Sequence, residues 1–205
     1  DLLPQFLAKK TRNIHKTSVI HPTAVIDGPV VISEGVKVLA HSTIVGPAYI
    51  GANTVIANNT LVRESSIGEN CVIGFGTEIA RSILANNVWT HMSYVGDSIL
   101  ANNVSLGGGT TTGNLRLDER EISSVIKNIA IPTGRRKVGS MIGEHCRLGI
   151  HTTNAPGIKI GENSFIESAC YLTEDIPQDS FVNMKNGVCT IRKNREEPIK
   201  LRGKF

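Results

Sequence analysis

The sequence predicts an all-β fold, a parallel β-helix in which short strands coil into a triangular prism. Every sixth residue from Ile20 to Val62 is Ile or Val, a period that fits neither a helix nor a single alternating strand. Such a period indicates tertiary repetition, in which three six-residue units close one coil and the coils stack at about 4.8 Å. A second inward position, four residues further on, holds small or modest residues such as Ala24, Ser42 and Thr54.

The composition agrees with a narrow prism filled by aliphatic side chains. Hydrophobic residues make up 40% of the 205 residues, but aromatic residues only 4%. The 20 glycines suit a chain with many tight bends. The net charge of +4 is compatible with anionic ligands, and equally with scattered solvated lysines and arginines.

The four cysteines do not form a C-x-x-C pair, so the sequence does not indicate a zinc or redox motif. Cys71, Cys146 and Cys170 occupy small inward positions, where we expect reduced, buried thiols. Reduced thiols suit a reducing compartment, and neither a signal peptide nor a membrane-spanning run is apparent. We therefore expect a cytoplasmic protein with neither a membrane nor a nucleic acid as partner.

The repeat divides the chain into three parts. Residues 1–17 lack the period and are expected to be a short helix or a linker from a preceding domain that is missing here. Residues 18–175 carry the period over about seven coils, with an excursion at 113–137 whose alternating pattern suggests a two-stranded hairpin. Residues 176–205 are expected to form a cap strand and a loose tail.

The period fails first between residues 79 and 100. The step shortens by one residue before Leu84, and ten residues separate the inward positions Thr90 and Leu100. Bulges at corners re-aim neighbouring side chains and are often found beside functional sites. We therefore expect the chemistry of the protein in this region.

His91 follows the inward residue Thr90, so its side chain should point outward, just ahead of the excursion. Imidazole titrates near neutral pH and can serve as a general base, although an ordinary surface histidine fits the same pattern. Glycines 107–109 either leave bare backbone for an extended ligand or form a tight corner. The basic cluster 135–137 either clamps a phosphate or forms a solvated loop.

These segments resemble those of a known family. The repeat as a whole resembles the left-handed parallel β-helix of hexapeptide transferases. The segments HMSYVGDS from His91, NVSLGGGT and Gly113–Asn114 resemble the acetyltransferase domain of bifunctional N-acetylglucosamine-1-phosphate uridylyltransferase/glucosamine-1-phosphate acetyltransferase. The stretch GRRKVGSMIGEHCRLGIHTTNAPGIKIG is similar to archaeal-type sugar-1-phosphate nucleotidylyltransferases that carry such a domain. The resemblance covers residues 20–175.

The resemblance implies transfer of an acetyl group from the co-substrate acetyl-CoA to the amine of an amino-sugar 1-phosphate, without a metal. It also implies a homotrimer whose active sites lie between subunits. It assigns catalytic roles to His91 and Asn114, a substrate contact to Tyr94, and donor contacts to Gly108, Gly149 and Ser168.

Basic residues are expected to hold the phosphate of the acceptor. Arg63 and Arg81 are 18 residues apart, about one coil, and should stack on one face as an anion grip. Arg120 falls where the family has a lysine in the excursion, with Lys127 as an alternative. Ser105 stands where the family has an asparagine.

Two other functions fit these departures from the family pattern. One is a non-catalytic prism that trimerises and regulates a sugar-phosphate nucleotidylyltransferase whose catalytic domain is absent here. The other is acylation of a different small acceptor, which would need a pocket without a phosphate grip.

Overall fold

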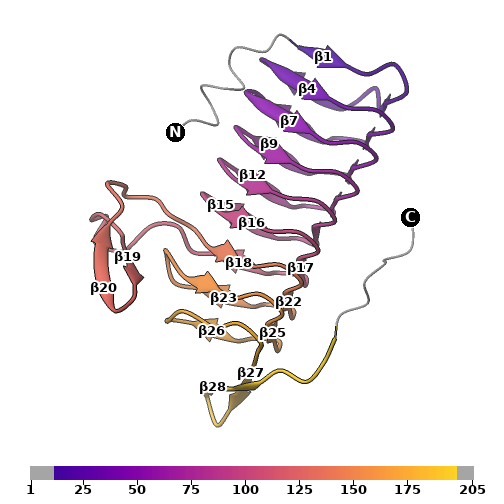
Figure 1. Ribbon diagram of the computed structural model, residues 1–205. Helices are drawn as coiled ribbons and strands as arrows, with labels where there is room; N and C mark the ends of the chain where they lie inside the picture. Colours follow the sequence, from indigo (N-terminus) through magenta and orange to yellow (C-terminus); the bar gives the residue numbers. More distant parts are fainter. Residues whose placement is uncertain (1–11, 198–205) are drawn as a thin grey trace.

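The computed structural model describes residues 12–197, which form a parallel β-solenoid of about nine turns (Figure 1). Each complete turn supplies one short strand to each of three parallel sheets, named sheets A, B and C in the order in which the chain enters them. The predicted all-β parallel β-helix is confirmed. No helix in the described part of the chain is long and apolar enough to cross a membrane.

Consecutive strands of one sheet come from consecutive turns. Sheet A contains β1 (Asn13–Ile14), β4 (Val30–Ile32), β7 (Ala48–Ile50), β10 (Ser66–Ile67), β13 (Ile83–Leu84), β16 (Ile99–Leu100), β21 (Met141–Ile142) and β24 (Lys159–Ile160). Sheet B contains β2 (Val19–Ile20), β5 (Lys37–Val38), β8 (Val55–Ile56), β11 (Val72–Ile73), β14 (Trp89–Thr90), β17 (Ser105–Leu106), β22 (Arg147–Leu148), β25 (Phe165–Ile166), β27 (Ser180–Lys185) and β28 (Val188–Lys193). Sheet C contains β3 (Val25–Asp27), β6 (Thr43–Val45), β9 (Leu61–Arg63), β12 (Glu78–Ala80), β15 (Tyr94–Gly96), β18 (Thr111–Thr112), β23 (Thr153–Asn154) and β26 (Tyr171–Leu172).

The chain bends at three corners, named AB, BC and CA after the sheets that they join. Side chains at every sixth position point inward and stack along the prism axis. The parallel register places Ile44 on Ile26 and beneath Val62, and Ile44 and Val62 are fully buried. These inward side chains, called rungs below, stack into a continuous aliphatic column. Removal of this column from water is the main favourable contribution to folding.

The second inward position is small because it lies at a corner, where the neighbouring turns approach closely. Ser42 and Thr54 are fully buried there, and their hydroxyl groups donate hydrogen bonds of 2.6 and 2.9 Å to the carbonyl oxygens of Ala57 and Gly68. A hydroxyl that is satisfied in this way can be buried at little cost. The preference for Ser and Thr at this position therefore has a hydrogen-bonding reason as well as a steric one.

Three cysteines fill the same small inward position, as the sequence predicts. Cys71, Cys146 and Cys170 are buried, and all four cysteines are unpaired. Burial raises the pKa of the Cys71 and Cys146 thiols to about 11. Burial, with a smaller contribution from nearby Cys189, raises the pKa of Cys170 to about 12. These thiols therefore behave as small hydrophobic groups near neutral pH.

The prism is longer than the predicted seven coils. β1 pairs in parallel with β4, so the first turn begins at Asn13, inside the stretch expected to be a linker; residues 1–11 lie outside the described residues. At the other end, β27 pairs in parallel with β25, and β28 folds back antiparallel to close the sheet. Ile14 already stands six residues before Ile20, so the period itself extends further than the prediction followed it.

The predicted ten-residue step between Thr90 and Leu100 is wrong. Val95, in β15, is fully buried and supplies the intervening rung, so two five-residue steps replace the single long one. Ile83 consequently pairs with Ile99, and this turn is two residues shorter than a regular turn of the prism.

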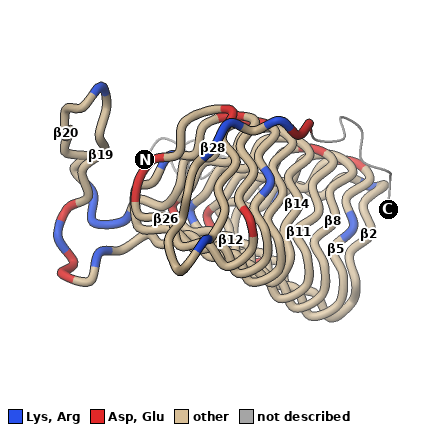
Figure 2. The backbone as a smooth tube through the Cα atoms, turned by 90° about the horizontal axis from the view of Figure 1, so that it is seen from below, with Lys and Arg blue, Asp and Glu red and all other residues tan. Residues whose placement is uncertain are grey.

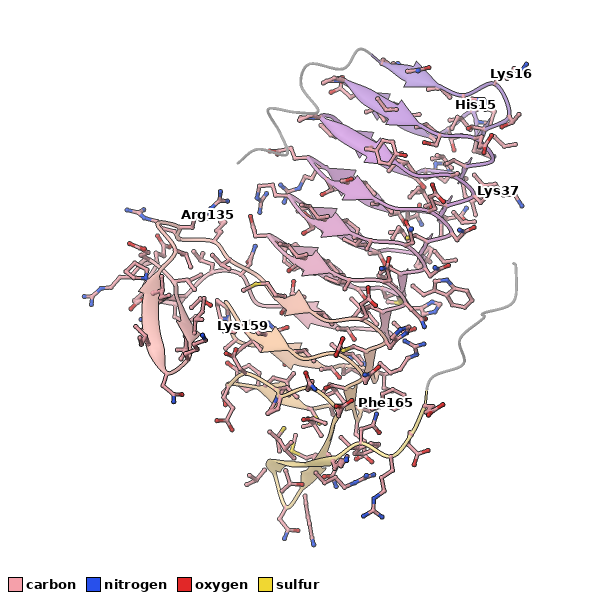
Figure 3. All side chains as sticks on the ribbon, viewed as in Figure 1. His15, Lys16, Lys37, Arg135, Lys159 and Phe165 are labelled. Atoms are coloured by element: carbon pink, nitrogen blue, oxygen red, sulfur yellow. The ribbon has the colours of Figure 1, made fainter. Side chains whose placement is uncertain are left out.

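The excursion forms the predicted hairpin, made of β19 (Ser123–Ile126) and β20 (Ile129–Pro132). This arm leaves the prism at corner CA and projects away from it (Figure 1). Figure 2 shows charged residues gathered where the arm joins the prism, whereas most of the prism wall is uncharged. Lys159 of β24 points toward the arm, and its Nζ lies 3.3 Å from Ser124 Oγ (Figure 3).

The rung register can be tested at Ile44. We expect Ile44→Asp to prevent folding, because a carboxylate inside the prism has neither water nor a partner. Ile44→Ala should lower the free energy of unfolding by about 2–5 kcal/mol. Thr43→Asp, on the outward face of the same strand, is the matched control and should leave the protein folded. Chemical denaturation followed by circular dichroism measures all three, and a near-native stability of Ile44→Asp would contradict the register.

Candidate functional site

His91 lies at corner BC, directly after β14, with its side chain exposed to solvent. The inward residue Thr90 is fully buried, so the next side chain turns outward, as predicted. Met92 then adopts a left-handed backbone with φ of 42°, unusual for a long side chain. A Cβ at Gly74 in the preceding turn would collide with the carbonyl oxygen of Thr90 and would also come within 3.2 Å of His91 Nδ1, so glycine lets the two turns approach closely beneath the imidazole.

The three residues that the resemblance assigns to the donor, Gly108, Gly149 and Ser168, lie on the same corner as His91, in the following three turns. Backbone hydrogen bonds join this corner from turn to turn: Gly109 N donates to His91 O at 3.2 Å, His151 N to Gly108 O at 2.8 Å and Ala169 N to Ile150 O at 2.8 Å. The corner is thus one continuous column that runs from the earlier turns past the histidine toward the cap.

A groove of about 310 Å³ lies along sheet B beside this column. Its lining includes His91, Ser105, Arg147, Gly149 and Phe165, and its walls are mainly apolar. Ser105 lies between Trp89 and Arg147 in neighbouring strands, so a small side chain between two large ones opens the groove next to His91. Phe165 lies on this wall, on the side of the prism away from the arm (Figure 3).

A second polar group of side chains lies at corner CA. Asp97 accepts hydrogen bonds of 2.7 Å from Arg81 Nε and Nη2, and one of 2.5 Å from Asn114 Nδ2. Asn114 Nδ2 also lies 3.0 Å from the Tyr94 hydroxyl. Burial favours a raised pKa for Asp97, but the hydrogen bonds from Arg81 and Asn114 outweigh it and lower the pKa. The hydrogen bond to Asp97 in turn raises the pKa of Arg81.

Arg63 and Arg81 stack one turn apart at corner CA, as the sequence predicts, with Arg81 N donating to Arg63 O at 3.0 Å. Each guanidinium group is, however, occupied by a carboxylate of the same chain. Arg63 Nη2 lies 2.7 Å from Glu78 Oε1, and Arg81 makes the bidentate pair with Asp97. Ion pairs of this kind argue against the predicted phosphate grip, because a phosphate would have to displace a carboxylate.

The catalytic and substrate-contact residues assigned by the resemblance occupy two corners of the prism. His91 lies at corner BC, whereas Tyr94 and Asn114 belong to the group at corner CA. β15 runs between the two corners, a distance of about 10 Å for three residues at 3.3 Å each. Within one chain, His91 and Asn114 therefore lie at different corners of the prism.

The arm holds the remaining predicted residues. Arg120 lines an open hollow at the base of the arm together with Glu121 and Arg135. Lys127 occupies the turn between β19 and β20, at the tip of the hairpin. Neither lies on corner BC of the same chain. Among residues 12–197, no three His, Cys, Asp or Glu side chains gather in a metal-binding arrangement.

Several residues of these sites were not predicted. Asp97 stands sixteen residues after Arg81, and this spacing reveals their contact only once Val95 is recognised as a rung. Phe165 and Arg147 occupy outward positions on sheet B, which the inward period leaves unspecified. Pairing the strands of sheet B through their inward residues places Arg147 and Phe165 in line with Ser105 on the outer face of the sheet.

The fold and the repeat define a hexapeptide-repeat β-helix domain. The family described as bacterial transferase hexapeptide (six repeats) matches residues 29–64. The chain is related to archaeal bifunctional proteins that combine a sugar-1-phosphate nucleotidylyltransferase with an acetyltransferase, at about 40% identity.

Individual relatives show how far this likeness extends. Bifunctional protein GlmU of Methanococcus vannielii is 35% identical over 180 residues, which cover 82% of this chain and 41% of that protein. The bifunctional sugar-1-phosphate nucleotidylyltransferase/acetyltransferase of Sulfurisphaera tokodaii is 44% identical over 91 residues, covering 44% of this chain and 23% of its own length. The chain thus spans less than half the length of these relatives.

A solved structure supports the fold. UDP-N-acetylglucosamine acyltransferase from Campylobacter jejuni superposes with a TM-score of 0.55 at 16% identity, covering 88% of this chain and 74% of that protein. At this level of identity the likeness concerns the architecture of the prism alone.

The group at corner CA can be tested through Asp97. We expect Asp97→Ala to lower the free energy of unfolding by about 1.5–3 kcal/mol at pH 7, because Arg81 and Asn114 lose a charged acceptor. The lowered pKa makes this contribution present above the unfolded value near 3.9 and lost as the pH falls below it. The difference from the wild type should therefore shrink at pH 3.

Denaturant titrations at pH 7 and pH 3 measure this difference. Asp27→Ala is the matched control, since Asp27 is an exposed residue at the same corner in the first turn. A difference for Asp97→Ala that stays the same at both pH values would show that its charge does not stabilise the corner.

Proposed function

We propose that this domain is an acetyl-CoA-dependent N-acetyltransferase that acts on an amino-sugar 1-phosphate such as glucosamine 1-phosphate. The observation that carries the proposal is the column at corner BC. There His91, the glycine backbone at Gly108 and Gly149, and Ser168 follow one another beside an apolar groove. The kinship with proteins named as nucleotidylyltransferase/acetyltransferases supports the same reaction class.

In the proposed reaction, His91 acts as the general base. Its imidazole removes a proton from the acceptor amine while the amine nitrogen attacks the thioester carbonyl carbon of acetyl-CoA. The carbon–sulfur bond of the tetrahedral intermediate then breaks, and the departing thiolate of CoA takes the proton from the imidazolium. An exposed imidazole suits this role because both substrates must reach it from solvent.

A complete site in this proposal needs two copies of the chain in a homotrimer. His91 comes from one copy, and the polar group of Tyr94 and Asn114 comes from corner CA of its neighbour. The position of these residues at different corners of one chain supports the arrangement. A cyclic homo-oligomer repeats the same pairing at each interface.

The acceptor phosphate needs a cationic side chain that does not already form an ion pair with a carboxylate at the same corner. Arg63 and Arg81 are paired, so we assign the phosphate to the arm, which carries Arg120 and Lys127 outward from corner CA. An arm that projects from its own prism is placed to reach a neighbouring copy (Figure 1). The proposed compartment is the cytoplasm, which suits four unpaired thiols.

The reaction can be tested by following free thiol during incubation with acetyl-CoA and glucosamine 1-phosphate or galactosamine 1-phosphate. We expect release of CoA, and His91→Ala should lower kcat by about 10²–10⁴-fold because the base is lost. His41→Asn is the matched control, at corner BC three turns earlier, and should retain activity. An oligomer that folds correctly and releases no CoA with either sugar would instead support the non-catalytic regulatory prism.

The two-copy site makes a separate prediction for mixtures. His91→Ala and Asn114→Ala should each be nearly inactive alone. Refolding them together should restore roughly a quarter of the wild-type rate, because about one in four neighbouring pairs then combines an intact His91 with an intact Asn114. Mixed samples that remain as inactive as the single variants would place both residues in one subunit's site, or in none.

A further inference from the structure

Cys170 and Cys189 bring two thiols together at the end of the prism. Cys170 fills the small inward position of the last complete turn and is fully buried. Cys189 lies in β28, opposite Met184, in the hairpin of β27 and β28 that caps the solenoid. Its side chain is half-buried against the core cluster that contains Cys170, and its Sγ lies 3.6 Å from the carbonyl oxygen of Tyr171, the residue after Cys170. The fold thus pairs two cysteines that lie far apart in the sequence.

The other two buried thiols have different partners. Cys71 Sγ donates a hydrogen bond of 3.2 Å to Ala85 O, and Cys146 Sγ donates one of 3.1 Å to Gly161 O. Both cysteines lie at corner AB, inside the regular part of the prism. They act as small hydrophobic groups of the core, and they provide internal controls for the chemistry of the pair at the cap.

The two thiols of the pair differ in their access to solvent. Burial raises the pKa of the Cys170 thiol to about 12, and nearby Cys189 adds to this shift, so Cys170 stays protonated near neutral pH. Cys189 is partly exposed, so a reagent in solution reaches its sulfur first. Once Cys189 has reacted, its sulfur remains beside Cys170, which attacks it at the high effective concentration of an intramolecular reaction.

The outer half of the cap hairpin has little attachment to the prism. β27 pairs with β25 at Phe181 and Val182, and residues 183–190 extend beyond this pairing. Among residues 12–197, the hydrogen bond that ties this segment to the last turn is the one from Cys189 Sγ to Tyr171 O. A segment held in this way opens at a low free-energy cost, and a disulfide restricts such opening. A covalent bond at Cys189 would therefore fix the hairpin on the prism.

We propose that Cys170 and Cys189 form a reversible disulfide that fastens the cap hairpin to the last complete turn in response to a low-molecular-weight disulfide. Phe181 of the same hairpin lines the groove beside His91, so this disulfide also fixes one end of the groove wall.

The bond forms in two steps of thiol–disulfide exchange. Cys189 loses its proton, and its sulfur attacks one sulfur of the small disulfide; a mixed disulfide forms, and the first small thiolate leaves and takes up the proton. Cys170 then loses its proton, and its sulfur attacks Sγ of Cys189; the bond between the two cysteines replaces the mixed disulfide, and the second small thiolate leaves with this proton. The two cysteine sulfurs together lose two electrons, which reduce one small disulfide to two thiols.

Oxidised glutathione is the probe that tests this assignment. Incubation of the full chain should lower the number of free thiols from four to two, counted with a thiol reagent after unfolding. Digestion with trypsin under non-reducing conditions should give two peptides joined through Cys170 and Cys189, and dithiothreitol should restore all four thiols. Four remaining thiols, glutathione attached to Cys189 without a cross-link, a bond to Cys71 or Cys146, or a cross-link between two copies of the chain would each overturn the proposal.

Two variants separate the steps. Cys170→Ser should stop at the mixed disulfide, so that Cys189 carries one glutathione, whereas Cys189→Ser should leave its three remaining thiols unmodified. Cys146→Ala is the matched control, since it removes a buried thiol elsewhere in the core and should still lose two thiols on oxidation. Glutathione attached to Cys170 in Cys189→Ser would contradict the proposed order of the two thiols.

Amide hydrogen exchange in residues 183–190 measures the effect on the hairpin. We expect exchange there to be about 10–100-fold slower in the oxidised protein than in the reduced protein, because the disulfide restricts local opening. The regular turns at 37–62 should not change, and Cys189→Ser treated with oxidised glutathione should exchange as the untreated variant does. Equal exchange rates of residues 183–190 in both redox states of the wild type would overturn the role of the disulfide in fastening the cap.

Discussion

The stacking of inward aliphatic side chains from turn to turn is the interaction on which this structure depends. Ile44 lies on Ile26 and under Val62, and Ile44 and Val62 are fully buried. Once these rungs are stacked in register, every outward side chain has fixed neighbours one turn above and one turn below. Outward residues that act together in this fold are therefore neighbours in successive turns, either along one corner or along the outer face of one sheet.

Corner BC shows how residues of successive turns form the candidate site around His91. The turn that carries His91 is two residues shorter than a regular turn of eighteen residues, because the rung at Val95 divides it into five-residue steps. Glycine at position 74 allows the close approach of the Thr90 carbonyl beneath the imidazole, and the glycines at 107–109 leave the corner above it as bare backbone. An extended thioester donor needs such a strip, since its amides can lie against backbone that no side chain covers.

Much of this arrangement was predicted from the sequence because the inward period is a strong physical signal. Burial allows only Ile, Val or Leu at most rungs, so the period revealed the fold, the outward direction of His91 and the buried thiol of Cys71. The pairing of Arg81 with Asp97 was missed because it joins outward residues of different turns. The period predicts which side chains face inward. Which outward charged residue pairs with which depends on the number of residues in the turn that separates the two partners.

The same limit explains the separation of His91 from Asn114. Both belong to one short block of sequence, but three residues of β15 are enough to carry the chain from one corner of the prism to the next. Nearness in sequence is a poor guide to nearness in a fold whose neighbours come from adjacent turns. Sheet B shows the converse, because Ser105 and Arg147 are far apart in sequence but adjacent on one wall.

In the proposed reaction, the donor lies along corner BC and the adjoining wall of sheet B. Amide hydrogen exchange with and without saturating acetyl-CoA measures this placement directly. We expect slower exchange in segments 105–109, 147–151 and 165–169 on addition of acetyl-CoA, with no change in the regular turns at 37–62. Protection confined to corner CA or to those regular turns, with none at corner BC, would contradict it.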